Sequence, residues 1–172
     1  FSRGWALMVT KVSRPVAKTL LGLGALGCYV AHGTYIVLAG RPEDLLWACH
    51  LGAGFVGMGL LARQPIIHAI GVLFLCLGTP LWLMDLATGG PFYPTSCLTH
   101  LGALAIGLVG VRLLGMSRFA SIHAILALLG LVVACRIVTP PPANVNVAFT
   151  TYPGMDRYFS SHGAYLATMM VL

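Results

Sequence analysis

The chain has 172 residues, of which 58% are hydrophobic and only 8% are charged, and its mean hydropathy is +0.90. A soluble domain carries about 25% charged residues, because its surface has to be hydrated. Ten lysines and arginines and four acids therefore exclude a soluble globular enzyme, a disordered chain and a protein that binds nucleic acid through a basic stripe. The composition predicts an integral membrane protein.

Apolar runs separated by turn-forming residues predict one domain over residues 1–172, an all-α, polytopic transmembrane bundle of about six helices. A helix that crosses the hydrocarbon layer needs roughly 20 apolar residues, and we expect five runs to satisfy this requirement. The sixth run is shorter and follows a proline-rich polar stretch, which cannot cross a bilayer as a helix. The expected helices lie near residues 18–40, 45–62, 65–86, 95–114, 118–138 and 158–172.

The charged residues are divided unevenly between the two ends of these expected helices. The end that holds the N-terminus carries seven lysines and arginines and no acid, whereas the opposite end carries three arginines and all four acids. Basic residues favour the cytoplasmic side of a membrane. The sequence therefore predicts a multi-pass protein with a cytoplasmic N-terminus.

Each of the six expected helices contains one histidine. Ionisable groups inside a membrane span are costly and usually face the interior of the bundle. His50 and His100 lie at similar depth in the second and fourth helices, and His68 and His123 in the third and fifth. Two imidazoles that face each other across a slot lined by small residues can hold a six-coordinate b haem. We therefore expect His50 with His100, and His68 with His123, to ligate the irons of two haems.

This pattern resembles the ascorbate-type di-haem transmembrane cytochromes b over about residues 44–138. In that family, histidines of the second and fourth helices form one pair and those of the third and fifth helices form the other. The run Cys97-Leu98-Thr99-His100 is similar to the family's Ser-x-His motif, and Arg63 corresponds to a basic residue after the second helix. The resemblance implies transmembrane electron transfer through two b haems, with Arg63 as a contact for the electron donor. It gives no role to His32 or His162.

A different interpretation starts from polar residues expected at the acid-bearing end. They are Asp44, Cys49, His50, Asp85, His100, Asn144, Asn146 and His162. A thiol and an imidazole that packing brings together can act as a nucleophile and its base. Cys49-His50 at a helix start, with His100 two helices later, is similar to the YwaF-like integral membrane proteins, whose animal relatives transfer fatty acyl chains between phospholipids. This second resemblance implies that Cys49 accepts the acyl group and that His100 is the base.

Two more hypotheses stay open at this stage, so the sequence does not decide whether the chain is an enzyme. Short loops and many small residues suit an accessory structural subunit of a larger membrane complex, or a homodimer.

The sequence also contains a repeat. His50-Leu51-Gly52-Ala53 recurs as His100-Leu101-Gly102-Ala103, which suggests that the second-and-third hairpin is duplicated as the fourth-and-fifth. The expected partners are the lipid bilayer and other membrane subunits or a second copy, and no nucleic acid.

Overall fold

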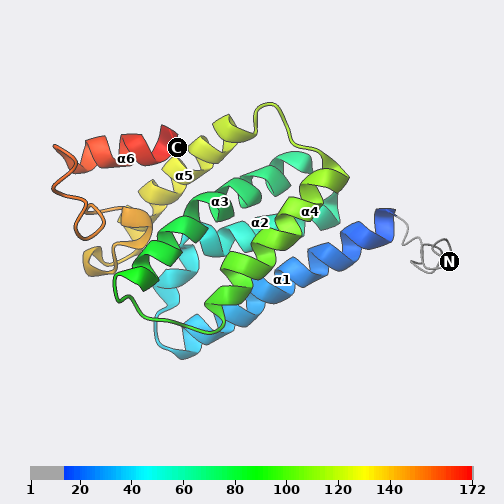
Figure 1. Cartoon of the computed structure of the whole chain (residues 1–172), viewed down its shortest axis with the longest axis horizontal. Helices are drawn as coiled ribbons and strands as arrows, with labels where there is room; N and C mark the ends of the chain where they lie inside the picture. The colour runs from blue at the N-terminus through cyan, green and yellow to red at the C-terminus, as the bar shows by residue number, and fades with distance from the viewer. Residues whose placement is uncertain (1–13, 172) are drawn as a thin grey trace, which may run out of the picture.

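The computed structural model describes residues 14–171, and within that range every regular element is a helix. The α-helices are α1 (Arg14–Leu38), α2 (Ala48–Ala62), α3 (Pro65–Ala87), α4 (Leu104–Leu114), α5 (Ala120–Val138) and α6 (His162–Val171) (Figure 1). The expected all-α bundle of six helices is confirmed. In the described part of the chain α1, α3 and α5 are long and apolar enough to cross a membrane, and α2 and the helix over 98–114 are shorter apolar helices. Arg3 and Lys11, which contribute to the expected orientation, lie outside the described residues.

Helix α2 occupies the centre of the bundle, between α1 and α3 (Figure 1). Glycines allow these backbones to touch, as is common in membrane bundles. A methyl group at Gly57 would lie 2.9 Å from the Gly22 carbonyl oxygen, and one at Gly52 would lie 2.9 Å from the Gly71 carbonyl oxygen. The buried side chains around this contact form one core cluster, which comprises Ala25, Ala53, Val56, Leu60, Val72, Leu75 and Ala103.

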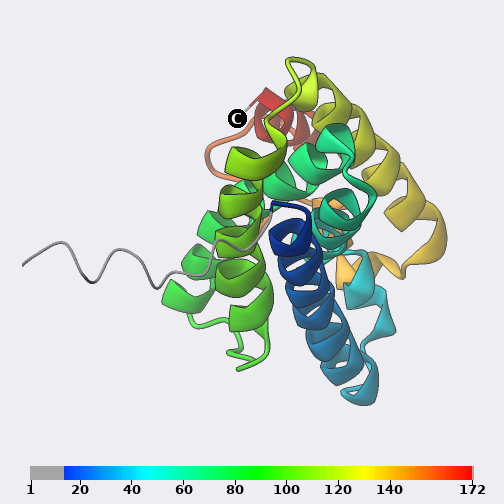
Figure 2. The same ribbon diagram turned by 90° about the vertical axis from the view of Figure 1, so that its right-hand side faces the viewer.

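Helix α5 packs against α3, and Figure 2 shows α4 and α5 on opposite sides of the bundle. The turn between them includes Gly115, whose φ of +79° favours glycine. Helices α2 and α3 therefore form a packed hairpin, whereas α4 and α5 do not. The suggested duplication of one hairpin as the other stays a prediction about the sequence, and the two pairs of helices differ in packing because α5 has α3 as its neighbour.

A second core cluster joins α5 to the segment that follows it. It consists of Val132, Cys135, Val145 and Ala148. The segment contains two short 3-10 helices, Pro141–Ala143 and Val145–Val147. Its chain reversal depends on asparagines, since Asn144 and Asn146 have φ values of 42° and 53°, in a region that asparagine tolerates better than most residues.

Several helix boundaries differ from the expected ones. A 3-10 helix, Pro42–Leu46, precedes α2, and Trp47 is extended (φ −59°, ψ 133°), so α2 begins at Ala48 rather than Leu45. The Trp47 indole N–H donates to Asp44 Oδ1 at 3.1 Å, which stabilises this break. Helix α6 begins at His162 rather than Tyr158, because Ser161 Oγ accepts a hydrogen bond from the Ala164 N–H at 3.1 Å and caps the helix there.

Two other boundaries shift by a few residues. The described part of helix α1 starts at Arg14, four residues before the expected start. The fourth run is divided, since a π-helix over Leu98–Ala103 leads into α4. The division matters for the site below, because His100 belongs to the π-helical turn.

Candidate functional site

A cavity of about 370 Å³ opens between the two core clusters. It is lined by the second half of α1, the start of α2, the second half of α3, the π-helical turn, α5, the segment after α5, and α6. Six of the eight polar residues expected to gather at one end of the bundle line it, namely Asp44, Cys49, His50, Asp85, His100 and Asn146. Asn144 and His162 do not line it.

The start of α2 carries Cys49 and His50 into this cavity, and Asn146 from the segment after α5 holds that start in place. Asn146 Oδ1 accepts a hydrogen bond from the Ala48 N–H at 2.7 Å, and Asn146 Nδ2 donates to the Leu46 carbonyl at 2.7 Å. Trp47, the residue before α2, offers no side-chain cap. Asn146 therefore acts as the N-cap of α2 from a distant part of the chain.

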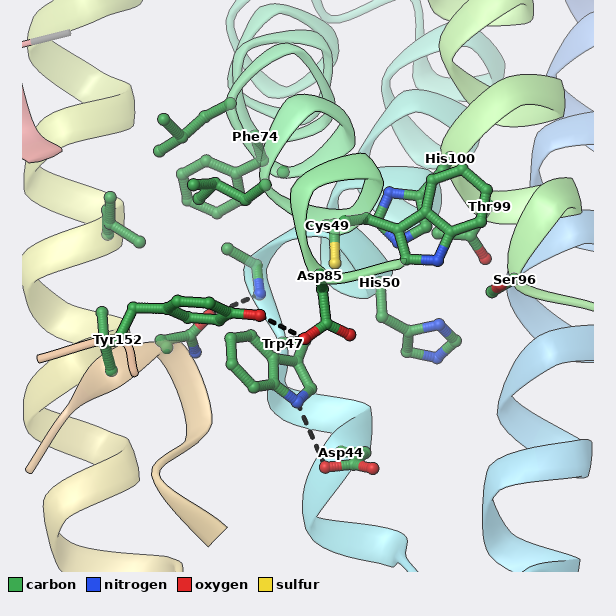
Figure 3. Close-up of a pocket in the computed structure, with 18 of the residues that line it drawn as sticks. Asp44, Trp47, Cys49, His50, Phe74, Asp85, Ser96, Thr99, His100 and Tyr152 are labelled. Carbon is green, nitrogen blue, oxygen red and sulfur yellow. Dashed lines mark hydrogen bonds between the residues drawn. The ribbon is translucent and has the colours of Figure 1, made fainter. Parts of the chain in front are cut away.

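Close packing against α3 fixes the position of the Cys49 side chain. A methyl group at Gly78 would lie 2.6 Å from Cys49 Cβ and 3.6 Å from its Sγ. Figure 3 shows Cys49, His50, Asp85 and His100 around the same space. Adjacent residues point about 100° apart on a helix, so His50 and Cys49 reach this space in different directions.

The π-helical turn places Thr99 and His100 on the cavity wall. Thr79 Oγ1 donates to the His100 carbonyl at 3.1 Å, and the Trp82 indole stacks on the His100 ring with 4.6 Å between centroids and 1° between planes. Single π-helical turns are frequent at functional sites. Together these contacts fix both the backbone and the ring of His100.

His50 lies in a cluster of aromatic rings. Its ring stacks on Tyr29 at 4.5 Å and meets His32 edge-on at 5.5 Å. His32 Nδ1 is 2.9 Å from Thr95 Oγ1, a hydrogen bond that connects α1 to the loop before the π-helical turn. The structure thus adds His32 to the site, a residue to which the haem hypothesis gave no role.

Buried polar atoms without a hydrogen-bond partner occur together in this cavity. In the described part of the chain they are His50 Nδ1, His50 Nε2, Thr99 Oγ1 and His100 Nδ1, and all three residues line the cavity. Buried polar side chains are normally hydrogen-bonded, and an exception needs an explanation. A ligand with hydrogen-bonding groups, held between these three residues, would satisfy them.

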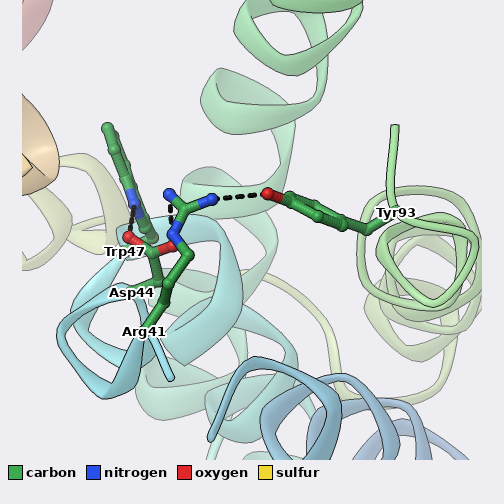
Figure 4. A network of polar contacts seen from close by, with 4 residues as sticks. All are labelled: Arg41, Asp44, Trp47 and Tyr93. Carbon is green, nitrogen blue, oxygen red and sulfur yellow. Dashed lines mark hydrogen bonds and ion pairs between the residues drawn. The ribbon is translucent and has the colours of Figure 1, made fainter. Parts of the chain in front are cut away.

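Arg41 and Asp44, which both line the cavity, form an ion pair that Figure 4 shows. Arg41 Nη2 is 2.6 Å from Asp44 Oδ2, and Arg41 Nη1 donates to the Tyr93 hydroxyl at 2.6 Å. Burial raises the pKa of Asp44 above its ordinary value, while the charge of Arg41 opposes this shift. The network joins the loop after α1 to the loop after α3 at the wall of the cavity.

A second polar pair involves Asp85 at the end of α3. The Tyr152 hydroxyl donates to Asp85 Oδ1, and burial together with this carboxylate raises the pKa of Tyr152 to about 12. Tyr152 therefore remains a neutral phenol at physiological pH. The pair connects the segment before α6 to α3 across the cavity.

The other two histidines of the haem hypothesis lie elsewhere. His68 is fully buried between α2 and α4, where its Nε2 donates to the Gly107 carbonyl at 3.1 Å and its Nδ1 is 3.4 Å from the Val56 carbonyl. A methyl group at Gly110 would overlap its ring. His123 lies on α5, with Nδ1 bonded to the Phe119 carbonyl at 2.8 Å. Neither histidine lines the cavity.

These contacts decide how well the histidines fit haem. As placed, His68 directs both ring nitrogens to carbonyls and has no free space beside its ring, so it does not fit a haem axial ligand. His50 and His100 do share a cavity and have unpaired ring nitrogens. Among residues 14–171, His, Cys, Asp and Glu side chains form no group of three that could hold a metal ion.

The sequence did not single out three side chains of the site. They are Trp82, Tyr152 and Thr99, of which only Thr99 belongs to a motif considered above, Cys97-Leu98-Thr99-His100. The useful signal for Trp82 is its spacing, because it lies four residues after Gly78 and three before Asp85, on the same face of α3. Nothing local in the sequence indicates that Tyr152 reaches Asp85.

Comparison with known proteins finds no family model, no characterised protein and no solved structure that matches this chain. Function has to be inferred from the cavity and its side chains.

Proposed function

We propose that this chain is a multi-pass integral membrane protein that transfers acyl groups from a lipid ester through a thioester on Cys49. Three helices long and apolar enough to cross a membrane support the location, together with the apolar composition. The observation that carries the proposal is the convergence of Cys49, His50, Thr99 and His100 in one cavity, with four ring and hydroxyl atoms unpaired.

The first half of the reaction forms the thioester. His100 takes the proton of the Cys49 thiol as its Sγ attacks the ester carbonyl carbon, and a new S–C bond forms. The C–O bond to the lipid alcohol then breaks, and the imidazolium returns the proton to the leaving oxygen. His100 is the better base than His50, because Cys49 and His50 are adjacent on α2 and diverge.

The second half regenerates the thiol. A hydroxyl of an acceptor lipid, or water, gives its proton to His100 and attacks the thioester carbonyl carbon. The C–S bond breaks, and Cys49 recovers its proton from the imidazolium. In both halves, negative charge develops on the carbonyl oxygen, and donors already aimed at that position accelerate the reaction. The unpaired groups of His50 and Thr99 suit this role.

A turnover measurement with matched cysteine variants tests the proposal. The purified protein is placed in dioleoylphosphatidylcholine vesicles that contain a phosphatidylcholine with an alkyne at the end of one acyl chain, and release or transfer of the tagged chain is followed. Cys49→Ala should abolish turnover, whereas Cys76→Ala, at an exposed cysteine of α3, should retain it. Equal turnover in wild type and Cys49→Ala would reject the proposal.

Haem binding is the second candidate, and one observation favours it. The unpaired ring nitrogens of His50 and His100 in a shared cavity are the residues that would hold one b haem, which supplies one-electron chemistry when bound. The geometry around His68 supports no second haem. An absorption spectrum separates this candidate from acyl transfer.

A further inference from the structure

The cavity has a polar part and an apolar part, and these two parts follow one another along one face of α3. Phe74, Gly78, Trp82 and Asp85 are four, four and three positions apart, so they fall on one stripe of the helix, and all of them line the cavity. At 1.5 Å per residue the stripe is about 16 Å long. Asp85 lies at its end with Tyr152, Trp82 stacks on His100, and Gly78 contacts Cys49.

Beyond Cys49 the stripe continues into apolar surroundings. Phe74 is one helical turn before Gly78, and Figure 3 shows it on the far side of Cys49 from Asp44. Leu128 of α5 and Phe74 of α3 lie at similar distances from the starts of their helices, about 2.2 and 2.5 turns respectively. The apolar part is completed by Val132 of α5 and by Leu166 and Met169 of α6.

From this arrangement we infer that the space between α3, α5 and α6 binds the hydrocarbon chain of the acyl group, with its carbonyl carbon at Cys49. The chain then extends from the thiol toward the middle of the bundle, and the alcohol part of the ester remains near Asp85 and Tyr152. The inference rests on the proposed function for the position of the carbonyl group. It adds the class of substrate, a lipid ester whose transferred acyl group is one long aliphatic chain, and names α5 as the helix that limits the length of that chain.

We assign a lipid chain to the cavity because its polar part and its apolar part belong to one continuous space. The polar atoms without partners lie at the histidines, whereas Phe74, Leu128, Val132 and Leu166 offer only hydrocarbon. A space of this composition favours an apolar occupant. An ester with a long chain has polar and apolar parts in the order that the cavity presents them.

Leu128 is the residue to vary, because it lines the cavity and lies outside the buried cluster of α5. Its neighbour Leu129 is 45% exposed and provides a matched control. Leu128→Trp should fill the apolar part, and Leu129→Trp should leave it open. Overpacking of a buried space is costly, so we expect occupancy of the apolar part to fall by about tenfold or more in Leu128→Trp.

Photolabelling tests the inference independently of catalysis. Cys49→Ala protein is placed in dioleoylphosphatidylcholine vesicles that contain a fatty acid methyl ester with a diazirine at the chain end, and cross-linked peptides are identified by mass spectrometry. Cross-links on Phe74 or Leu166 that Leu128→Trp removes and Leu129→Trp preserves support the inference. Labelling confined to lipid-facing residues such as Leu129 and Val133 overturns it.

A second measurement separates this inference from the proposed function. Turnover of tagged esters of increasing chain length should decline in Leu128→Trp for long chains while short chains persist. If Cys49→Ala abolishes turnover but Leu128→Trp leaves the chain-length profile unchanged, the chain-binding assignment is wrong and acyl transfer stands. If photolabelling marks the cavity but Cys49→Ala turns over normally, the thioester is wrong and the binding site stands.

Discussion

Replacement of Asn146 by glycine tests how the reactive start of α2 is held. Glycine adopts the φ of 53° seen at this position without strain, so the substitution removes the side chain and leaves the backbone conformation accessible. What is lost is the pair of 2.7 Å hydrogen bonds to the Ala48 N–H and the Leu46 carbonyl, together with a 3.3 Å hydrogen bond from Asn146 Nδ2 to Cys135 Sγ. Both backbone groups flank Trp47, which lies two residues before Cys49.

The expected cost follows from the burial of this side chain. Asn146 is only 6% exposed, so water does not readily replace it. A buried donor or acceptor left without a partner costs about 1–3 kcal/mol, and two such groups cost roughly 2–4 kcal/mol when they relax in part. In a chain of this size that corresponds to a decrease in Tm of roughly 5–15 °C.

The measurement combines thermal unfolding in detergent with acyl turnover. Asn146→Gly should lower Tm and should reduce turnover even at temperatures where the protein is folded, because the Cys49 thiol loses its fixed position. Asn144→Gly is the control, since Asn144 also has a positive φ but bonds only within its own segment, to Phe149 and Thr150. Unchanged Tm and turnover in Asn146→Gly would refute the capping role.

Three further predictions concern packing, pH and haem. Gly110→Ala should destabilise the bundle strongly in thermal unfolding because the added methyl overlaps the His68 ring, whereas Gly24→Ala, where the nearest atom is at 3.4 Å, should be tolerated. As pH falls, Asp44 should become protonated at a higher pH than an exposed aspartate, since burial raises its pKa. The protonated carboxyl therefore stabilises the folded protein at low pH, and this contribution is lost as pH rises through the raised pKa. Trp47 fluorescence should report this titration, and Asp44→Asn should abolish it; persistence in the variant would assign the signal to another group. Acyl transfer predicts that purified protein shows no b-type band in a reduced-minus-oxidised spectrum, whereas a band equal to about one haem per chain would instead support haem binding by His50 and His100.

The sequence predicted the helices because their signals are local. Apolar runs end at breakers such as Gly40-Arg41-Pro42 and Gly89-Gly90-Pro91, and the observed helices end within a few residues of them. The break at Trp47 was not predictable from hydropathy, because Leu45, Leu46 and Trp47 continue an apolar run. It depends on a side-chain contact to Asp44 and a cap from Asn146, about a hundred residues later.

The sequence did not predict which helices are neighbours or which face each helix turns toward its neighbour. Pairing histidines by depth placed His50 with His100, and both line the cavity. The same reasoning paired His68 with His123, but rotation about the helix axis, which depth does not specify, directs His68 to the carbonyls of α2 and α4. Helix α5 packs on α3, and this choice of neighbour creates the apolar part of the cavity.

Direct detection of the thioester tests the central claim. Wild-type protein is mixed with the alkyne-tagged lipid ester, quenched in acid within the first turnover, and digested for mass spectrometry. The account predicts a hydroxylamine-sensitive acyl adduct on the peptide that contains Cys49, and none on the peptide that contains Cys76. Turnover of the ester without any adduct on Cys49, or an adduct on Cys76 alone, would contradict it.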